Sequence, residues 1–172
     1  GSFSGHVQRD LGQEGFNRLV RHAYDRGVRF FETADSYADM HTMLGIALKG
    51  IPRDSYALLT KVTTFDGVKP QQRIDELRSQ ARTDYFDVML LHWQRGTAWP
   101  HETTGWQDAI DEAQHRGVVR SRGASVHGLP ALAQVPTFKW LQVAMIRCNH
   151  RGTRMDTPVA DSGGTGNVPE VV

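Results

Sequence analysis

Five short apolar runs, separated by stretches with helical spacing, constrain the fold of this chain more than any other feature. The runs are rich in β-branched and aromatic residues and lie at Val28–Phe31, Tyr56–Val62, Tyr85–Leu91, Gly117–Ala124 and Trp140–Ile146. The first three are nearly continuous in apolar residues, which is typical of strands buried on both faces. The fourth carries arginines and fits only a partly exposed strand. We therefore expect five strands, the first three of them enclosed.

Amphipathic segments lie between these runs. Each places apolar residues three or four positions apart, which is the spacing of one helix face. The four faces are Phe16, Leu19, Val20 and Ala23; Met43, Leu44, Ala47 and Leu48; Ile74, Leu77 and Ala81; and Trp106, Ile110 and Ala113. Helices that alternate with buried strands predict βα units and a parallel sheet, that is, an α/β fold.

Composition narrows the class of protein. The chain has 172 residues, is 39% hydrophobic and carries a formal charge of +1, which suits one soluble domain with a real core. Its lysines and arginines are scattered, so no nucleic-acid partner is expected. A single cysteine, Cys148, excludes an internal disulfide and a multi-cysteine zinc site. No apolar run reaches the roughly 20 residues of a membrane span, so we expect a cytoplasmic protein.

The chain divides unevenly along its length. Residues 1–151 carry all the predicted strands and helices. Residues 152–172 are rich in glycine, proline and aspartate, and include GGTG at 163–166. We expect this segment to be a flexible tail.

Each of the five runs ends in a polar residue. These residues are Glu32, Lys61, His92, Ser125 and Asn149. In a parallel α/β barrel the carboxyl ends of the strands open on one face, and the active site lies there. An acid, a lysine and a histidine among five strand ends favour a catalytic site over ordinary strand termination.

The first strand end continues into FFETADSY, where Tyr37 follows Glu32 by five residues. A phenol is a poor acid at neutral pH, but a nearby ammonium favours the phenolate and lowers its pKa. We expect Lys61 to play this part, with Glu32 holding the lysine and His92 orienting a carbonyl oxygen. Such a group could give a proton to an alkoxide as it forms.

Four segments in order, GVRFFETADSY, LLTKV, DYFDVMLLHW and GVVRSRGAS, resemble the aldo-keto reductase family. The resemblance runs from about Gly15 to Asn149 and implies a (β/α)8 barrel that uses NADPH or NADH. It also implies a tetrad of an acid, a tyrosine five residues later, a lysine and a histidine. By position these are Glu32, Tyr37, Lys61 and His92, with glutamate standing where the family has aspartate.

The resemblance also implies a site for the nicotinamide. The family carries Ser-Asn after the fifth strand, where this chain has Ser125 and Val126, and Met145 stands in place of a glutamine. Asn149 matches an asparagine often found nearby. A full barrel needs about 250 residues. We therefore expect an incomplete barrel with five strands of eight, equivalent to strands 2 to 6, without the units that bind the cofactor phosphates.

Other functions remain open at this stage. Glu32 and Asp35 could form the carboxylate pair of a glycosidase-like hydrolase. GASVHG at 123–128 lacks the second glycine of a nucleophile elbow, because His127 stands there. Asp35, Asp39 and His41 could be metal ligands, but we expect ordinary loop residues and no metal. A third possibility is a non-catalytic remnant that self-associates through open sheet edges into a homo-oligomer.

The resemblance and the strand-end residues together favour one function. We expect NAD(P)H-dependent reduction of an aldehyde or ketone, with a small carbonyl compound as the substrate. Tyr37 would be the proton donor, tuned by Lys61 and Glu32, and His92 would orient the carbonyl.

Overall fold

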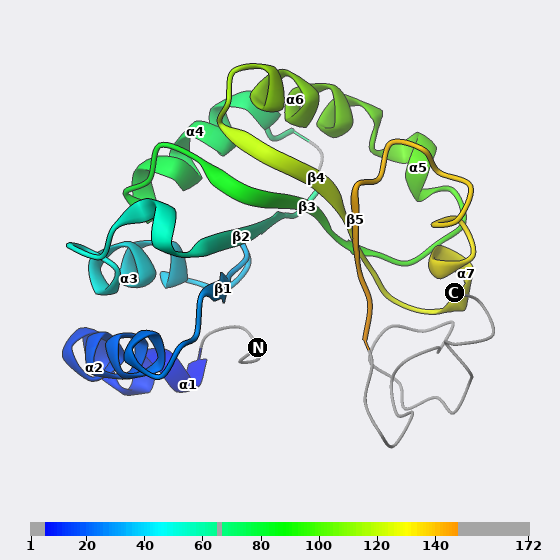
Figure 1. The fold of residues 1–172 in the computed structure, drawn as a ribbon. Coiled ribbons are helices and arrows are strands. Elements are labelled where there is room, and N and C mark those ends of the chain that lie inside the picture. The colour runs from blue at the N-terminus through cyan, green and yellow to red at the C-terminus, as the bar shows by residue number, and fades with distance from the viewer. Residues whose placement is uncertain (1–5, 65–66, 148–172) are drawn as a thin grey trace.

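The computed structural model describes residues 6–64 and 67–147 and shows a curled sheet with helices on its outer face (Figure 1). The strands are β1 (Phe30–Glu32), β2 (Ala57–Val62), β3 (Phe86–Gln94), β4 (Val119–Val126) and β5 (Val143–Met145). All neighbouring strands are parallel, and their order in the sheet is their order along the chain. The predicted α/β fold, with five parallel strands forming part of a barrel, is confirmed.

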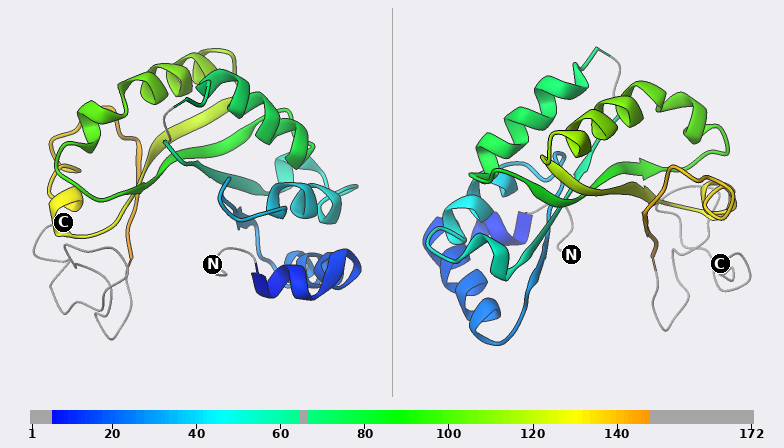
Figure 2. Two further views of the ribbon diagram at one scale, coloured as in Figure 1. Left: turned by 180° about the vertical axis from the view of Figure 1, so that it is seen from behind. Right: turned by 45° about the horizontal axis from the view of Figure 1, so that its top comes forward.

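Helices connect and cover the strands. They are α1 (His6–Asp10), α2 (Gly12–Asp25), α3 (Met40–Ala47), the 3₁₀ helix η2 (Arg53–Ser55), α4 (Pro70–Ala81), α5 (Trp99–Glu102), α6 (Thr104–His115) and α7 (Leu129–Leu132). Figure 2 shows that α3, α4 and α6 lie along the convex side of the sheet. This arrangement leaves the concave side without a layer of helices among the described residues.

The core lies between the convex side of the sheet and these helices. It is built from the apolar faces predicted for α3, α4 and α6, whose residues are buried, including Leu44, Ile74 and Ile110. Phe31, Leu58 and Met89 from the first three strands pack into the same cluster. Burial of each such side chain stabilises the fold by about 1.5–3 kcal/mol.

The central strands match the sequence patterns better than the edge strands do. Strand β2 is buried from Leu58 to Val62, and β4 is exposed at Arg120 and buried toward its end, as predicted. The run at Trp140–Ile146 forms only the three-residue β5, because Trp140 lies in a turn and Leu141, Gln142 and Ile146 lie outside the strand.

The expectation that the first strand is buried on both faces was wrong. Phe30 in β1 is 52% exposed, and the nearby Val28 and Leu19 are exposed as well. Strand β1 forms one edge of the sheet and is hydrogen-bonded only to β2 among the described strands. An apolar residue of an edge strand remains open to solvent where no neighbour covers it.

Strand register places the predicted site residues on one face of the sheet. Glu32 pairs with Leu59, two residues before Lys61, and Lys61 pairs with Leu90, two residues before His92. Side chains two residues apart point to the same face, and so do partners in a parallel ladder. Continuing across β4 and β5, the concave face therefore carries Glu32, Lys61, His92, Ser125 and Met145.

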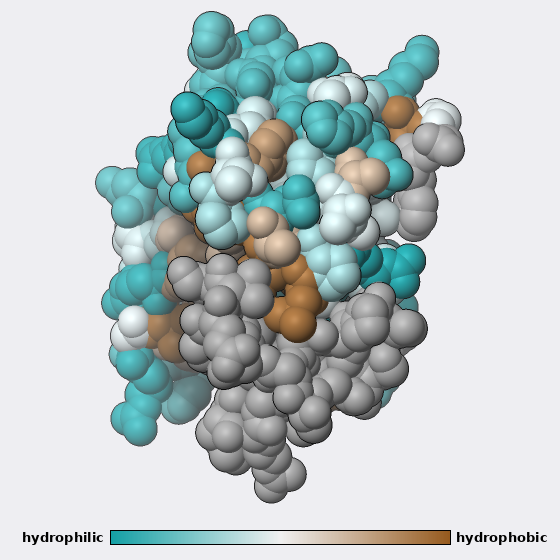
Figure 3. Space-filling model, turned by 90° about the vertical axis from the view of Figure 1, so that its right-hand side faces the viewer, coloured by the Kyte–Doolittle hydropathy of each residue, from teal (hydrophilic) through white to brown (hydrophobic). Residues whose placement is uncertain are grey.

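The surface on the side of β5 is mixed in character. Figure 3 shows hydrophobic residues at the middle of this face and mainly hydrophilic residues above them. Among the described residues, no helix is both long and apolar enough to cross a membrane. Asn149, Cys148 and the segment 152–172 lie outside the described residues.

Candidate active site

Lys61 is the most enclosed charged group of the concave face. The residue is 1% exposed and its Nζ donates a hydrogen bond to Oε1 of Glu32. Burial lowers the pKa of Lys61, because the charged form loses water, while the Glu32 carboxylate opposes this shift. The carboxylate is thus the group that keeps a buried lysine charged.

Tyr37 lies in the loop after β1, and a tight turn brings its ring back over the strand ends. The Tyr37 amide donates to the carbonyl of Ala34 at 3.1 Å, and the Met40 amide donates to the carbonyl of Tyr37 at 3.0 Å. The Lys61 Nζ lies 4.8 Å from the centre of the Tyr37 ring, in a cation–π contact. The lysine therefore approaches the face of the ring.

The expected lowering of the Tyr37 pKa was wrong. Burial raises the pKa of Tyr37, and the negative charge of Glu32 raises it further, against a smaller lowering by Arg147. Lys61 is hydrogen-bonded to Glu32, and within the described part of the chain no hydrogen bond joins its ammonium to the phenol oxygen. Glu32 and burial therefore outweigh the effect that the sequence attributed to the lysine.

His92, in strand β3, packs against the Tyr37 ring. The two rings meet edge to face, with centroids 5.7 Å apart and planes at 82°. Burial, reinforced by the charge of Lys61, lowers the pKa of His92 to about 4. The ring is consequently neutral at pH 7, with one nitrogen able to donate and the other able to accept a hydrogen bond.

A β-bulge follows His92. Between the pairs Leu91–Ala124 and Gln94–Val126, strand β3 advances three residues while β4 advances two. Trp93 takes up the extra residue with a φ of 62°, a left-handed conformation that bulky residues rarely adopt. The Gln94 side chain then donates to the His92 carbonyl at 2.8 Å, and the Gln94 carbonyl accepts from the His127 amide at 2.8 Å. The backbone around His92 is fixed on both sides.

Asp35 is occupied by structural contacts. Its carboxylate accepts hydrogen bonds from the Thr63 amide at 2.9 Å and from the Thr63 hydroxyl at 2.6 Å, and Arg73 Nε lies 3.9 Å away. These contacts tie the loop after β1 to the end of β2 and to α4. Asp35 and Glu32 therefore have separate sets of partners.

His41 belongs to the core. It is 1% exposed, its Nε2 lies 2.7 Å from the Thr60 hydroxyl, and its ring meets Phe86 edge to face. Burial lowers its pKa to about 4. Within the described residues, no group of three His, Cys, Asp or Glu side chains is arranged to hold a metal ion.

The cofactor residues suggested by the sequence are differently placed. Ser125 is 4% exposed on the concave face, and its hydroxyl lies 3.3 Å from Nε2 of His127. Val126 packs in the core cluster on the other side of β4, so it does not line the concave face. Met145 is half-buried in β5, and Asn149 lies outside the described residues.

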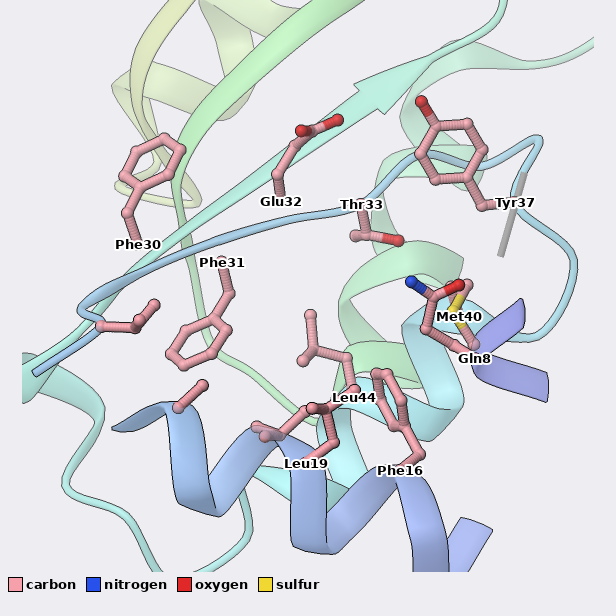
Figure 4. Close-up of a pocket in the computed structure, with 13 residues that line it drawn as sticks. Gln8, Phe16, Leu19, Phe30, Phe31, Glu32, Thr33, Tyr37, Met40 and Leu44 are labelled. Atoms are coloured by element: carbon pink, nitrogen blue, oxygen red, sulfur yellow. The ribbon is translucent and has the colours of Figure 1, made fainter. Parts of the chain in front are cut away.

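A cavity of about 380 Å³ lies beside β1, and its lining includes Glu32 and Tyr37 as well as apolar residues of α2 and α3. Figure 4 shows Phe31 pointing from β1 toward Phe16 and Leu19 of α2 and Leu44 of α3, which line the cavity. The carboxylate of Glu32 and the hydroxyl of Tyr37 point the opposite way. The cavity is therefore a mainly apolar space behind the polar cluster.

Three further residues around His92 escaped the sequence analysis. Two of them contact the histidine, namely Ser36 and Gln94. The third, Trp93, forms the bulge in the strand directly after it. Ser36 sits in a polar loop, where a serine gives no particular signal. The bulge at Trp93 has no sequence mark either, since such positions usually carry glycine or asparagine.

Comparison with known proteins identifies the family of this chain. The sequence profile described as the Aldo/keto reductase family matches residues 4–157. The chain belongs to the aldo/keto reductase family. Members are oxidoreductases that use NAD(P)H to reduce small carbonyl compounds.

Among its relatives is an aldo-keto reductase of Mycolicibacterium paratuberculosis, 28% identical over 176 residues, covering 93% of this chain and 61% of the relative. A methylglyoxal reductase of Yersinia pestis is 28% identical over 118 residues, covering 67% and 42% respectively. This aldo/keto reductase chain thus spans about half the length of the curated relatives it matches.

Solved structures show the same fold. An aldo-keto reductase from Bacillus halodurans in its holo form has a TM-score of 0.66 at 21% identity, covering 83% of this chain and 52% of that one. An aldo/keto reductase from Brucella melitensis has a TM-score of 0.60 at 22% identity, covering 78% and 52%. The described strands therefore correspond to part of the barrel of these aldo/keto reductases.

Proposed function

We propose that this chain carries the proton-transfer site of an NAD(P)H-dependent reductase of aldehydes or ketones. The observation that carries the proposal is the position of the Lys61 ammonium, between the Glu32 carboxylate and the face of the Tyr37 ring. The His92 ring meets the same tyrosine at its edge. An acid, its charge partner and a neutral hydrogen-bonding group are thus in mutual contact.

Each residue has a distinct part in this proposal. Tyr37 gives its phenolic proton to the carbonyl oxygen as that oxygen gains negative charge. The Lys61 ammonium stabilises the negative charge left on the tyrosine, and Glu32 keeps the lysine charged and in place. His92 is neutral and orients the carbonyl oxygen by a hydrogen bond. These groups leave the substrate itself undefined beyond a small carbonyl compound.

On the concave face, one residue has the chemistry to bind a nicotinamide cofactor. The buried Ser125 hydroxyl faces this side, next to the strand that carries His92, and can bond the carboxamide. When bound, the nicotinamide supplies the hydride for the carbonyl carbon. Val126 faces the core and cannot help, and the Met145 thioether is a weak acceptor without a donor.

The hydrolase hypothesis has less support. A glycosidase needs two carboxylates that face the same bond, one of them free to give a proton. Here Glu32 is bonded to Lys61, while Asp35 is held by Thr63 and lies near Arg73. The partners of these acids therefore favour the reductase.

A fluorescence titration of NADPH against the purified chain tests the proposal. We expect binding, together with consumption of NADPH when a small aldehyde such as methylglyoxal is added. Release of a chromogenic sugar without any NADPH binding would instead support the hydrolase.

The exposed apolar residues beside β1 favour self-association as a second candidate function. Phe30, Val28 and Leu19 are exposed next to a strand edge that is unpaired among the described residues. Such edges pair readily with other strands. Light scattering should show dimers or larger species whose proportion falls in Phe30→Lys, whereas a monomer at high concentration would contradict this candidate.

A further inference from the structure

The ring of His92 has one polar partner among the described residues, the hydroxyl of Ser36. The Ser36 Oγ lies 3.3 Å from Nδ1 of the ring, and the two residues come from different elements, the loop after β1 and strand β3. Ser36 itself is exposed, and His92 Nδ1 is the one group of the described chain within hydrogen-bonding distance of its hydroxyl.

We infer that Ser36 is a positioning residue that holds the neutral ring of His92 in the tautomer with its proton on Nε2. A serine hydroxyl can donate to Nδ1 or accept from it, so the contact at 3.3 Å fits either tautomer. Where the hydroxyl donates, the proton of the neutral ring lies on Nε2, and this is the arrangement that we assign to Ser36. This inference rests on the proposed function, in which His92 must donate to a carbonyl oxygen. The opposite tautomer would present a lone pair to that oxygen and repel it.

The rest of the surroundings of His92 fix its backbone and leave the tautomer to Ser36. Gln94 and the bulge hold the main chain, with the Gln94 side chain bonded to the His92 carbonyl at 2.8 Å. The Tyr37 ring packs on the imidazole edge to face and constrains its tilt. Neither contact distinguishes Nδ1 from Nε2 as the protonated nitrogen.

The inference is tested by nitrogen NMR of the ¹⁵N-labelled chain at pH 7, because the shifts of the two ring nitrogens report the tautomer directly. The spectrum of His92→Gln assigns the His92 signals. We expect the Nε2–H form in the unmodified chain, a mixture of both forms in Ser36→Ala, and restoration of the Nε2–H form in Ser36→Thr. Ser55→Ala, which removes an equivalent hydroxyl far from the ring, is the matched control.

Turnover gives a second measurement. Loss of one hydrogen bond that orients the histidine should lower kcat/KM by roughly 3- to 10-fold in Ser36→Ala, mostly in kcat, with recovery in Ser36→Thr. An Nδ1–H ring in the unmodified chain, or an unchanged tautomer in Ser36→Ala, would overturn the inference. Because the NMR spectrum needs no substrate, this outcome can be told apart from a failure of the reductase proposal, which would show as absent turnover.

Discussion

The two ends of the concave face differ in how many polar groups hold one another in place. At the β1–β3 end, Glu32, Lys61, Tyr37 and His92 are linked by an ion pair, a cation–π contact and an edge-to-face ring contact. At the β4–β5 end, Ser125 faces the concave side, Val126 turns to the core and Met145 offers only a thioether. In the proposed reductase, this difference means that the groups for proton transfer are more complete than the groups that would bind the nicotinamide.

The largest expected effect is the loss of turnover in Tyr37→Phe, and a substitution at each end tests whether the two ends have different roles. Tyr37→Phe removes the acid but keeps the ring and its contacts, so it should lower kcat by roughly 10²–10⁴-fold and leave NADPH affinity nearly unchanged. Ser125→Ala should have the opposite pattern: it should lower the affinity for NADPH by roughly 3- to 10-fold, because one hydrogen bond is lost, and leave kcat nearly unchanged. Steady-state kinetics and fluorescence titration measure both. If Tyr37→Phe lowered the affinity for NADPH while Ser125→Ala stopped turnover, the roles assigned to the two ends would be wrong.

Acid should destabilise the fold through two histidines, His41 in the core and His92 at the β1–β3 end of the concave face. The pKa of His41 is lowered from 6.5 to about 4, so below pH 6.5 the unfolded chain takes up a proton that the folded chain refuses. The free energy of unfolding should therefore be largest above pH 6.5, fall by roughly 3 kcal/mol between pH 6.5 and 4, and level off below. His92 adds a similar but smaller dependence, because its ring is partly exposed.

Urea unfolding at pH 7 and pH 5 measures this dependence. His41→Gln can keep a hydrogen bond to Thr60 without titrating, so it should be less stable at pH 7 yet lose less stability on acidification. His115→Gln, at the end of α6, provides a control. An equal loss in all three proteins would show that other groups cause the pH dependence.

The length of the residue at position 32 should tune the acid at the β1–β3 end. Glu32→Asp is one methylene shorter, so its carboxylate should lie nearer the β1 backbone and farther from the Tyr37 phenol oxygen. A more distant carboxylate lowers the pKa of Tyr37, which burial and the charge of Glu32 raise here. A fall of one unit in the pKa of Tyr37 changes its protonation equilibrium roughly tenfold. The gain in kcat from Glu32→Asp should therefore not exceed roughly tenfold for each unit by which this pKa falls.

The dependence of kcat on pH measures this effect, since its alkaline limb should move to lower pH in Glu32→Asp. Glu32→Gln is the control, because it keeps the length but removes the charge that holds Lys61. Identical profiles for Glu32→Asp and the unmodified chain would show that the extra methylene has no consequence for Tyr37.

The smallest effect concerns the sparse β4–β5 end. Met145→Gln would add a donor and an acceptor beside Ser125 on the concave face, since residues 125 and 145 are partners in register. One added hydrogen bond should tighten NADPH by roughly 3- to 10-fold without changing kcat. Val126→Asn should fail to do so, because that side chain faces the core and would be buried without partners. Fluorescence titration with NADPH measures the affinity of both variants. Tighter binding by Met145→Gln alone would support the contrast between the two ends, and equal affinities would contradict it.

Much of the fold could be read from the sequence because buried strands and helix faces have distinct spacings. The apolar runs located β2 within one residue and the start of β3 within one residue, although β3 continues three residues past the predicted end, to Gln94. The strand ends located Lys61 and His92. An incomplete barrel already predicts open sheet edges, but the apolar run that contains Phe30 has the same local pattern as a strand buried on both faces, so the spacing alone predicted burial where the structure shows 52% exposure. The same limit applies to Tyr37, since only coordinates show that Lys61 approaches the face of its ring and not its oxygen.

The order of the strands has a consequence for how this sheet comes together. Each strand pairs with the one that precedes it in the chain, so every pairing closes a short crossover and none joins distant segments. Assembly can then proceed by adding one βα unit to the last, much as repeat proteins grow from neighbour to neighbour. Opening can proceed in the same units from the outside inward, with the three-residue strands β1 and β5 exchanging their amide hydrogens before β2, β3 and β4.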